Sequence, residues 1–435
     1  MLRAPSAVVE IARTLTVSGY ETWCVGGAVR DALLGRNSLD WDLATAAPPN
    51  VVRRLFRRTV PVGIEFGTVG VLDAGGIMHE VTTFRRDVHT DGRHAVVEFG
   101  ASLDEDLARR DFTINAIAFD PIGERVHDPF GGRDDLAAGL VRAVGDAEAR
   151  LNEDRLRALR AIRFASRFDF AIEPETWRAI VGSAPFLARL SPERVKQEVE
   201  KTMEQVHRPS IAFRRWRDSD AFRALVPGLA SVTDQILAAV DSLPTPGLRT
   251  RPQRRALRIA ALLSDLEGRA AESALRALRF SNHDVGWISG LVQLWQVFGV
   301  ELTATICADE ALADSDLRRL AARVGRLRVS SFLRLAAAHW SALPASQAPP
   351  AARIRTVYKR ALRIAFHDAI DLADLAIDGD DLRAAGIPAG PIYGPLLASL
   401  LKAVVEEPSY NERGLLLGRA REFAATWVRA PVVVP

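Results

Sequence analysis

Hydrophobic and polar positions follow strand-like and helix-like patterns in the first part of the chain, and helix-like patterns alone in the last part. Three segments that are rich in β-branched residues and bounded by glycine or proline predict strands: 23–25, 61–72 and 78–84. Residues 1–22 and 48–60 predict short helices, and from about residue 206 onward the periodicity is helical. The pattern therefore predicts the α+β fold class, with the strands confined to the N-terminal part.

Length and composition narrow the class of protein. A chain of 435 residues is too long for one ordinary core, so we expect two to four domains. Two cysteines, Cys24 and Cys307, give no disulfide framework and no zinc spacing. No uninterrupted apolar run reaches the roughly 18 residues of a membrane helix, and the N-terminus lacks a signal pattern. We expect a cytoplasmic protein that does not enter a membrane.

The charged residues indicate weakly that the protein binds nucleic acid. The formal net charge is only +3, but arginine supplies nearly all of the positive charge and lysine occurs at four positions only. Arginine forks suit phosphates and stacked bases better than lysine does. A GC-rich genome also enriches arginine, so the composition alone does not decide the partner.

The most informative stretch is 23–42. A predicted strand ends at Val25, the glycines Gly26 and Gly27 follow, and a short helix that carries Arg30 extends to Leu34. Adjacent glycines let a ligand approach the backbone closely, and the start of a helix offers unpaired N–H groups to an anion. This stretch predicts a phosphate cradle.

Two carboxylates follow the cradle. Asp40 and Asp42 are separated by one residue on a predicted strand, so both point from one face, about 7 Å apart at the backbone. Oxygen ligands in such a pair suit Mg²⁺, and a phosphate cradle beside a metal pair indicates phosphoryl or nucleotidyl transfer. The alternative is two solvated aspartates at the end of a strand.

Gly-Gly followed by Asp-x-Asp resembles the DNA-polymerase-beta-like nucleotidyltransferases. The form Gly-Gly-x-x-Arg-Asp is similar to class II tRNA nucleotidyltransferases, the CCA-adding enzymes, and to the related bacterial poly(A) polymerases. The resemblance implies a nucleotidyltransferase head with a mixed sheet, followed by an all-α neck, body and tail. The parts it implies are a catalytic head (1–140), a base-recognising neck (141–205), a helical body (206–345) and a tRNA-binding tail (346–435).

Two further features of the head belong to this comparison. Met78–Phe84 ends like a family strand, which makes Glu80 a candidate third acidic group near the metals, although a solvated glutamate fits equally well. Residues 86–95 are polar and predict a loop. Within the family, the enzymes that add only CC look as if they have lost a loop at this place. The resemblance therefore implies that a chain that keeps the loop adds the complete CCA.

Residues 109–116 match the family's Arg-Arg-Asp-Phe motif. Arg110 presents a fork suited to a triphosphate, and Asp111 is suited to accept a hydrogen bond from a ribose 2′-hydroxyl. Without the first motif, a helix cap with a local ion pair would explain these residues. The related segment 128–136 contains Gly131 and Gly132 and predicts a hinge between head and neck.

The segment 152–164 predicts one helix that begins at Asn152. Asp154, Arg157 and Arg160 recur every three residues along one flank, and Arg163 lies one turn beyond. Glu-Asp-x-x-Arg resembles the family motif that selects CTP and ATP. An ionised Asp154 only accepts, as the exocyclic amine of cytosine or adenine requires, and Arg157 only donates, as their ring acceptors require. The acids also suit a helix start without any ligand.

The roles of the remaining positively charged residues follow from the resemblance. Arg160 and Arg163 are candidate phosphate or supporting groups, and Arg194 with Glu198 predicts a structural pair four residues apart on one helix. Arginine clusters at 249–258 and 353–363 are candidate contacts to an RNA backbone, although most such faces are merely solvated.

The expected function is a Mg²⁺-dependent, template-independent tRNA nucleotidyltransferase that adds or repairs the 3′-terminal CCA from CTP and ATP and releases pyrophosphate. The alternatives are a poly(A) polymerase or a CC- or A-only enzyme of the same fold, and an inactive RNA-binding protein. The expected partners are tRNA, CTP and ATP, without a membrane or an obligate protein partner.

Overall fold

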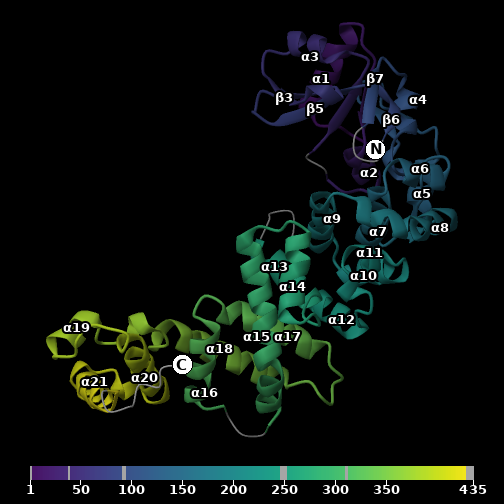
Figure 1. Ribbon diagram of the computed structural model, residues 1–435. Helices are drawn as coiled ribbons and strands as arrows, with labels where there is room; N and C mark the ends of the chain where they lie inside the picture. The colour runs from purple at the N-terminus through teal and green to yellow at the C-terminus, as the bar shows by residue number, and fades with distance from the viewer. Residues whose placement is uncertain (1, 38–39, 91–94, 245–251, 309–311, 428–435) are drawn as a thin grey trace. The chain divides into compact units, whose positions relative to one another are not determined.

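The protein is described by a computed structural model that covers residues 2–37, 40–90, 95–244, 252–308 and 312–427 (Figure 1). The chain divides into two compact units. The first runs from the N-terminus to Val232, and the second begins at Thr233. Each unit is described by itself, and the division into head, neck, body and tail stays a prediction.

A seven-stranded sheet forms the beginning of the first unit. Its strand order is β3-β4-β5-β2-β1-β8-β9. The strands are β1 (Thr22–Val25), β2 (Asp42–Thr45), β3 (Thr59–Gly63), β4 (Thr68–Leu72), β5 (Met78–Thr83), β8 (Ala118–Asp120) and β9 (Arg125–His127). Strands β2 and β5 pair in parallel, while the other neighbours are antiparallel. The sheet is therefore mixed, and the predicted α+β class with a mixed sheet is confirmed.

Helices cover one face of the sheet. α1 (Ser6–Val17) buries Val8, Ile11, Ala12 and Leu15 and packs against β1 and β2, and α3 (Pro49–Leu55) packs against β4 and β5. Side chains alternate along a strand, so Val81 is buried on the helix side while its neighbours Glu80 and Thr82 face the other way. Glu80 and Thr82 on this other face line a cavity.

The predicted loop at 86–95 was wrong for the part that the structure describes. β6 (Arg85–Thr90) pairs antiparallel with β7 (Ala95–Phe99), and the register shifts between Asp87 and His89. Residues 91–94, which join the two strands, lie outside the described residues. Cross-strand pairing can hold polar sequences, which is why polarity alone misled the prediction.

Helices make up most of the remainder of the first unit. They are α2 (Gly27–Leu33), α4 (Leu103–Ala108), α5 (Gly132–Ala138), α6 (Ala147–Glu153), α7 (Leu156–Phe168), α8 (Pro174–Ser183), α9 (Pro192–Gln205), α10 (Pro209–Asp218) and α11 (Ala221–Leu225). Two-residue strands β10 (Leu140–Val141) and β11 (Ala171–Ile172) pair in parallel and join the segment after α5 to the segment after α7. Helix α7 packs against α8, α9 and α10.

The described residues of the second unit form helices and turns only. They are α12 (Asp234–Ser242), α13 (Pro252–Leu262), α14 (Gly268–Ala277), α15 (Asn282–Cys307), α16 (Asp314–Val324), α17 (Val329–Ser341), α18 (Ala351–His367), α19 (Gly379–Ala384), α20 (Tyr393–Glu406) and α21 (Arg413–Trp427). Leu382, Leu396, Leu400 and Leu416 belong to a cluster that forms a local core for α19, α20 and α21. The predicted helical second half is confirmed.

Helix α15 is long and apolar enough to cross a membrane by length and composition, a test that core helices of soluble proteins also pass. It contacts α13, α14 and α17, and Ile288, Leu291 and Val292 are buried in these contacts. One face of the helix is buried in this way, whereas Val297 and Val300 are exposed.

Candidate active site

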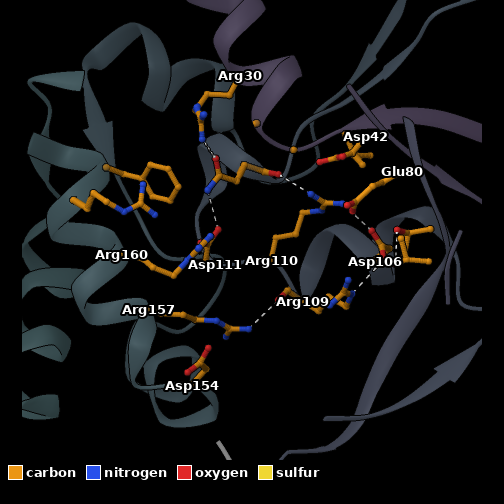
Figure 2. Close-up of a pocket in the computed structure, with 18 of the residues that line it drawn as sticks. Arg30, Asp42, Glu80, Asp106, Arg109, Arg110, Asp111, Asp154, Arg157 and Arg160 are labelled. Carbon is orange, nitrogen blue, oxygen red and sulfur yellow. Dashed lines mark hydrogen bonds and ion pairs between the residues drawn. The ribbon is translucent and has the colours of Figure 1, made fainter. Parts of the chain in front are cut away.

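One cavity of about 590 Å³ in the first unit brings together the predicted site residues except Asp40. Figure 2 shows Asp42 and Glu80 on one side of the cavity, and Asp154, Arg157 and Arg160 on the other. The predicted residues in its lining are Gly26, Gly27, Arg30, Asp42, Glu80, Arg110, Asp111, Asp154, Arg157, Arg160 and Arg163. Residues that are up to 137 positions apart in the sequence therefore share one cavity.

The turn between β1 and α2 lies against this cavity. Gly26 has φ 78° and ψ −137°, a conformation that favours glycine. A Cβ atom on Gly26 would lie 3.1 Å from Arg110 Nη1 and 3.9 Å from Asp42 Oδ2. The backbone at Gly26 thus lies close to both a guanidinium and a carboxylate, and its role as a phosphate cradle stays a prediction.

The two aspartates differ in their surroundings. Strand β2 begins at Asp42, opposite Val25 of β1, so Asp40 precedes the strand and is exposed. The prediction that both aspartates lie on one strand was therefore wrong for Asp40. The pKa of Asp42 is raised to about 7, chiefly by burial and further by the charges of Asp40 and Glu80. A cation beside Asp42 would relieve this repulsion.

The donor set is small. Among the described residues, no group of three or more His, Cys, Asp or Glu side chains is arranged to hold a metal ion. Mg²⁺ is commonly held by one or two carboxylates together with substrate phosphates. Asp42 lines the cavity and the charge of Asp40 acts on it, so the pair stays a candidate for such a site, and the idea that Glu80 is a third ligand gains no support.

Asp106 is a site residue that sequence reasoning missed. Its carboxylate, with a residue exposure of 1%, accepts hydrogen bonds from Arg109 Nε and Arg110 Nη2, both at 3.2 Å. α4, which carries Asp106, begins with a capping box formed by Ser102 and Glu105. The four-residue spacing between Asp106 and Arg110 is a signal that could have found this pair.

Arg30 connects helix α2 to helix α7. Its Nε and Nη2 donate to Asp31 Oδ1 at 2.8 and 2.6 Å, and its Nη1 donates to Asn115 Oδ1 at 2.6 Å. The guanidinium carbon lies 5.0 Å from the ring centre of Phe164 and 4.7 Å from that of Phe168. Cation–π contacts and hydrogen bonds therefore hold Arg30 in one orientation beside the cavity.

Asp111 is engaged on both oxygens. Oδ1 accepts from the Phe112 N–H and from Asn115 Nδ2, each at 2.9 Å, and Oδ2 accepts from Arg160 Nε and Nη2 at 2.9 and 2.7 Å. Burial acts to raise the pKa of Asp111, but Arg160 and Asn115 outweigh it, so that the pKa is lowered. The carboxylate is ionised at neutral pH.

The predicted single helix at 152–164 was wrong. α6 ends at Glu153, and Asp154 adopts an extended conformation with φ −149° and ψ 101° before α7 begins. Asp154 Oδ1 accepts from the Leu156 N–H at 3.1 Å, so Asp154, rather than Asn152, serves the start of the second helix. An acidic residue at a helix start and one inside a helix look alike in sequence.

Asp154 and Arg157 both line the cavity, and each is held by other residues. Asp154 Oδ2 accepts from Arg194 Nη2 at 2.6 Å. Arg157 Nη1 donates to Glu153 and to the Arg150 carbonyl at 2.7 and 2.8 Å, and Nη2 donates to the Arg109 carbonyl at 3.1 Å. These contacts with described residues do not use every acceptor site of Asp154. They also leave the Nε hydrogen and one Nη2 hydrogen of Arg157 for a further hydrogen bond.

The predicted pair between Arg194 and Glu198 is also wrong. Arg194 reaches Asp154, while Glu198 accepts from Arg163 Nε at 2.6 Å, and both side chains of this second pair are almost fully buried. Arg194 and Glu198 of α9 therefore bind two different residues at or near α7. Spacing along one helix could not reveal partners on a neighbouring helix.

Further residues line the cavity without having been predicted: Val25, Leu43, Thr68, Thr82, Arg85, Asp106, Arg109, Asn115, Phe164, Arg167, Lys201 and Gln205. Lys201 and Gln205 come from α9, and no motif in the sequence ties that helix to the head. Burial lowers the pKa of the Lys201 ammonium. Together with the arginines of α7, these side chains make one part of the cavity strongly cationic.

The segment 128–136 forms a turn that leads into α5, and its role as a hinge stays a prediction. Asp128 accepts from the N–H groups of Gly132 and Arg133 at 2.8 and 2.9 Å, which caps α5. A Cβ atom on Gly132 would lie 2.2 Å from the Thr113 carbonyl oxygen. Gly132 is therefore required by close packing, and Gly131 by its φ of 69°.

The arginine clusters of the second unit are largely engaged in its own fold. Arg258 is fully buried and donates to the Leu243 carbonyl, and Arg360 and Arg363 both contact Asp314. Arg249 and Arg251 lie outside the described residues. These contacts contradict the prediction that Arg258 binds RNA phosphate and account for Arg360 and Arg363 structurally.

Comparison with known families gives two matches. Residues 22–142 match the family described as the poly A polymerase head domain. Residues 169–233 match the family described as a probable RNA and SrmB-binding site of polymerase A. The matched segments cover the sheet with its cavity-lining turns and the helices that follow α7.

Curated relatives extend along nearly the whole chain. A CCA-adding enzyme from Lactiplantibacillus plantarum is 34% identical over 421 residues, which is 96% of each chain. One from Geobacillus stearothermophilus is 36% identical over 410 residues, which is 93% of each chain. A solved structure, the Bacillus stearothermophilus CCA-adding enzyme in complex with CTP, is 34% identical with a TM-score of 0.75 and covers 97% of this chain and 98% of its own.

Proposed function

The chain belongs to the family of CCA-adding enzymes, and we propose that it adds or repairs the 3′-terminal CCA of tRNA from CTP and ATP without a nucleic-acid template. Pyrophosphate is the second product. The substrates are the 3′ end of tRNA and the two nucleoside triphosphates, and the protein acts without a membrane. We expect it to work in the cytoplasm.

The observation that carries this proposal is the lining of the cavity of about 590 Å³ in the first unit. Asp42 and the glycine turn, which suit the reacting phosphate, share it with Asp154 and Arg157, which suit a base edge. A nucleotide that reaches both groups presents its α-phosphate near the carboxylates while its base is read on the other side. Base choice by side chains is the requirement of synthesis without a template.

Nucleotidyl transfer of this kind generally needs a divalent metal, and we propose Mg²⁺ for this chain. Asp40 and Asp42 are the residues that would hold it. When bound, the metal would lower the pKa of the attacking hydroxyl and neutralise charge on the triphosphate. Burial is the chief cause that raises the pKa of Asp42 to about 7, and the nearby charges of Asp40 and Glu80 add to it; a cation beside Asp42 would offset both effects, which supports a cation at this position.

Side chains of the head bind and orient the triphosphate. The backbone at Gly26 and Gly27 gives it close access, and the forks of Arg30 and Arg110 donate to phosphate oxygens. The 3′-hydroxyl of the tRNA attacks the α-phosphorus, and the bond to the pyrophosphate group breaks. No covalent intermediate with the protein is required, so these residues act by position and charge.

The nucleoside is recognised by side chains that can only accept or only donate hydrogen bonds. Asp111 accepts from the ribose 2′-hydroxyl, Asp154 accepts from the amine of cytosine or adenine, and Arg157 donates to their ring acceptors. Uracil and guanine present a carbonyl where the amine should be, and the Asp154 carboxylate repels it. Arg160 and Arg163 support this part of the cavity, through Asp111 and Glu198 respectively.

Incubation with a tRNA that lacks CCA and with each nucleotide in turn tests the function. Products separated on a sequencing gel should stop after two C residues with CTP alone and gain one A when ATP is added. A long A tail would identify a poly(A) polymerase, and a product that stops at CC with both nucleotides would identify a CC-adding enzyme. Tight tRNA binding without incorporation would leave only an RNA-binding role.

A further inference from the structure

Asn115 contacts three residues of the proposed nucleotide site. It lies at the end of a short 3₁₀ turn, η2 (Thr113–Asn115), with 7% of its surface exposed. Its Oδ1 accepts from Arg30 Nη1 at 2.6 Å, and its Nδ2 donates to Asp111 Oδ1 at 2.9 Å. Its backbone carbonyl accepts from Arg110 Nη1 at 3.4 Å.

The orientation of the Asn115 amide follows from its partners. A guanidinium only donates and an ionised carboxylate only accepts, so Oδ1 must face Arg30 and Nδ2 must face Asp111. The backbone on either side is also fixed, because the Thr113 hydroxyl donates to Asp135 at 2.6 Å and the Asn115 N–H donates to the Phe112 carbonyl at 2.9 Å. Asn115 therefore presents one donor to Asp111 from a rigid turn.

The two oxygens of Asp111 are held in different ways. Oδ1 is held by the Phe112 N–H and by Asn115, both of which belong to the same turn. Oδ2 is held by Arg160 alone among the described residues, through a long side chain from α7. With about four acceptor sites on a carboxylate, these four hydrogen bonds leave no site open for a sugar hydroxyl.

We propose that Asn115 is a positioning residue for sugar selection: it fixes Oδ1 of Asp111 so that Oδ2 can exchange Arg160 for the ribose 2′-hydroxyl. Arg160 is the partner that yields, because its contact is made by a flexible side chain. Asn115 is the partner that stays, because its turn and Arg30 hold it. The inference rests on the proposed function, in which Asp111 accepts from the 2′-hydroxyl.

Sugar selection is tested by kcat/KM for CTP and for dCTP in Asn115→Ser and Asn115→Asp. Serine removes the amide that bridges Arg30 and Asp111, whereas aspartate keeps an acceptor for Arg30 and replaces the donor to Asp111 with a second carboxylate. We expect the preference for CTP over dCTP to fall about 10-fold in Asn115→Ser, mainly through a higher KM for CTP, since one hydrogen bond to a charged group is lost. It should fall at least as far in Asn115→Asp, where the two carboxylates also repel each other. A folded variant that keeps the wild-type preference overturns the proposal.

Asn411→Ser is the matched control. Asn411 also bridges two segments, accepting from the Ala376 N–H and donating to the Asp374 carbonyl, but it lies in the second unit. Its variant should keep the wild-type preference between CTP and dCTP. Asp111→Ala distinguishes the role of Asp111 from that of Asn115. If Asp111→Ala keeps the preference for CTP over dCTP, Asp111 does not select the sugar. If Asp111→Ala loses the preference and the Asn115 variants keep it, only the role of Asn115 is refuted.

A structure of the wild-type protein with bound CTP supplies a test that does not depend on variants that fold. The hydrogen bond between Asn115 Nδ2 and Asp111 Oδ1 should persist, while Asp111 Oδ2 contacts the sugar in place of Arg160. A bound state in which the Asn115 bond breaks and the Arg160 bonds remain overturns the proposal.

Discussion

Arg160 of α7 holds Asp111 by two hydrogen bonds to the same oxygen, with Nε and Nη2 at 2.9 and 2.7 Å from Oδ2. Asp111 follows the arginine pair of the head, and 49 residues separate it from Arg160 in the sequence. Asp111 in turn raises the pKa of the Arg160 guanidinium, chiefly through its charge. The two groups therefore stabilise each other in the ionised state across the contact between the sheet-bearing region and α7.

Removing Arg160 should destabilise the protein more than it alters sugar choice. Arg160→Ala leaves the Asp111 charge buried without its strongest partner, which costs about 3 kcal/mol in unfolding free energy. Asp111→Ala/Arg160→Ala should recover part of this loss, because the unpaired charge is then gone. Urea denaturation measures these differences. Equal stability of Arg160→Ala and the double variant would contradict this coupling. A lower preference for CTP over dCTP in Arg160→Ala would contradict the proposal that Arg160 only gives way to the ribose.

Much of the fold could be predicted because local patterns and local structure agree. The strands at 61–72 and 78–84, the glycine turn at Gly26 and the helical second half follow from spacing that neighbouring residues set. Side-chain alternation also placed Glu80 on the open face of the sheet, where it lines the cavity. These features depend on residues close in sequence.

Features that depend on tertiary contacts could not be predicted in the same way. Asn115 is one of many buried polar residues in the sequence, and only the folded chain shows that Arg30 and Asp111 meet on it. Likewise, Arg194 and Glu198 look like a local pair until α9 packs against α7. The break at Asp154 arises because its side chain bonds the Leu156 N–H, a choice that a continuous helical pattern does not reveal.

Loss of either metal-binding candidate should abolish transfer. Asp42→Ala and Asp40→Ala remove proposed ligands, so incorporation of label from ATP or CTP should fall to background even at saturating Mg²⁺. Binding of tRNA, measured by filter retention, should stay within about twofold of wild type, because neither carboxylate is expected to contact the tRNA body. Substantial turnover in either variant would refute the assignment. Glu80→Gln should retain activity, because the described residues include no group of three acidic side chains that is arranged to hold a metal ion.

Shortening the β6–β7 hairpin should affect A addition more than C addition. The described residues of the segment 86–95 belong to β6 and the start of β7, and the family resemblance links a segment of this kind to the addition of the final A. Deleting residues 86–95 should leave product stalled at CC on a sequencing gel. A deletion variant that adds A at the wild-type rate would show that the hairpin has no such role.

His339 should make the stability of the second unit depend on pH. Its ring stacks on Trp295 with centres 4.4 Å apart, and burial lowers the pKa of His339 from 6.5 to about 4. Because the folded state resists the proton, the unfolded state binds more protons below pH 6.5, and the unfolding free energy falls as the pH drops toward 4. Relative to His339→Phe, the wild type should lose about 2 kcal/mol between pH 7.5 and pH 5 in urea denaturation. Parallel pH curves for the two proteins would contradict this cause.

Asp154 and Arg157 should act as one base-reading unit. Asp154→Ala removes the acceptor for the base amine, so kcat/KM for CTP and ATP should fall by about one to two orders of magnitude, or about 1.5–3 kcal/mol. Part of the exclusion of UTP and GTP should also disappear. The double variant with Arg157→Ala should lose less than the sum of the single losses, since each residue's contribution depends on a base that the other holds.

The competing explanation of Asp154 is purely structural, because its side chain bonds the Leu156 N–H at the start of α7. Loss of such a cap costs about 1 kcal/mol of stability and leaves base preference unchanged. Arg194→Gln provides the matched variant: it removes the ion pair at Asp154 Oδ2 but keeps the carboxylate, so it should weaken CTP and ATP use only modestly while UTP and GTP stay excluded. Thermal melts and kinetics with all four nucleotides on these variants decide between the explanations. An Asp154→Ala protein that is less stable yet still rejects UTP and GTP as wild type does would mean that Asp154 serves the helix and not the base.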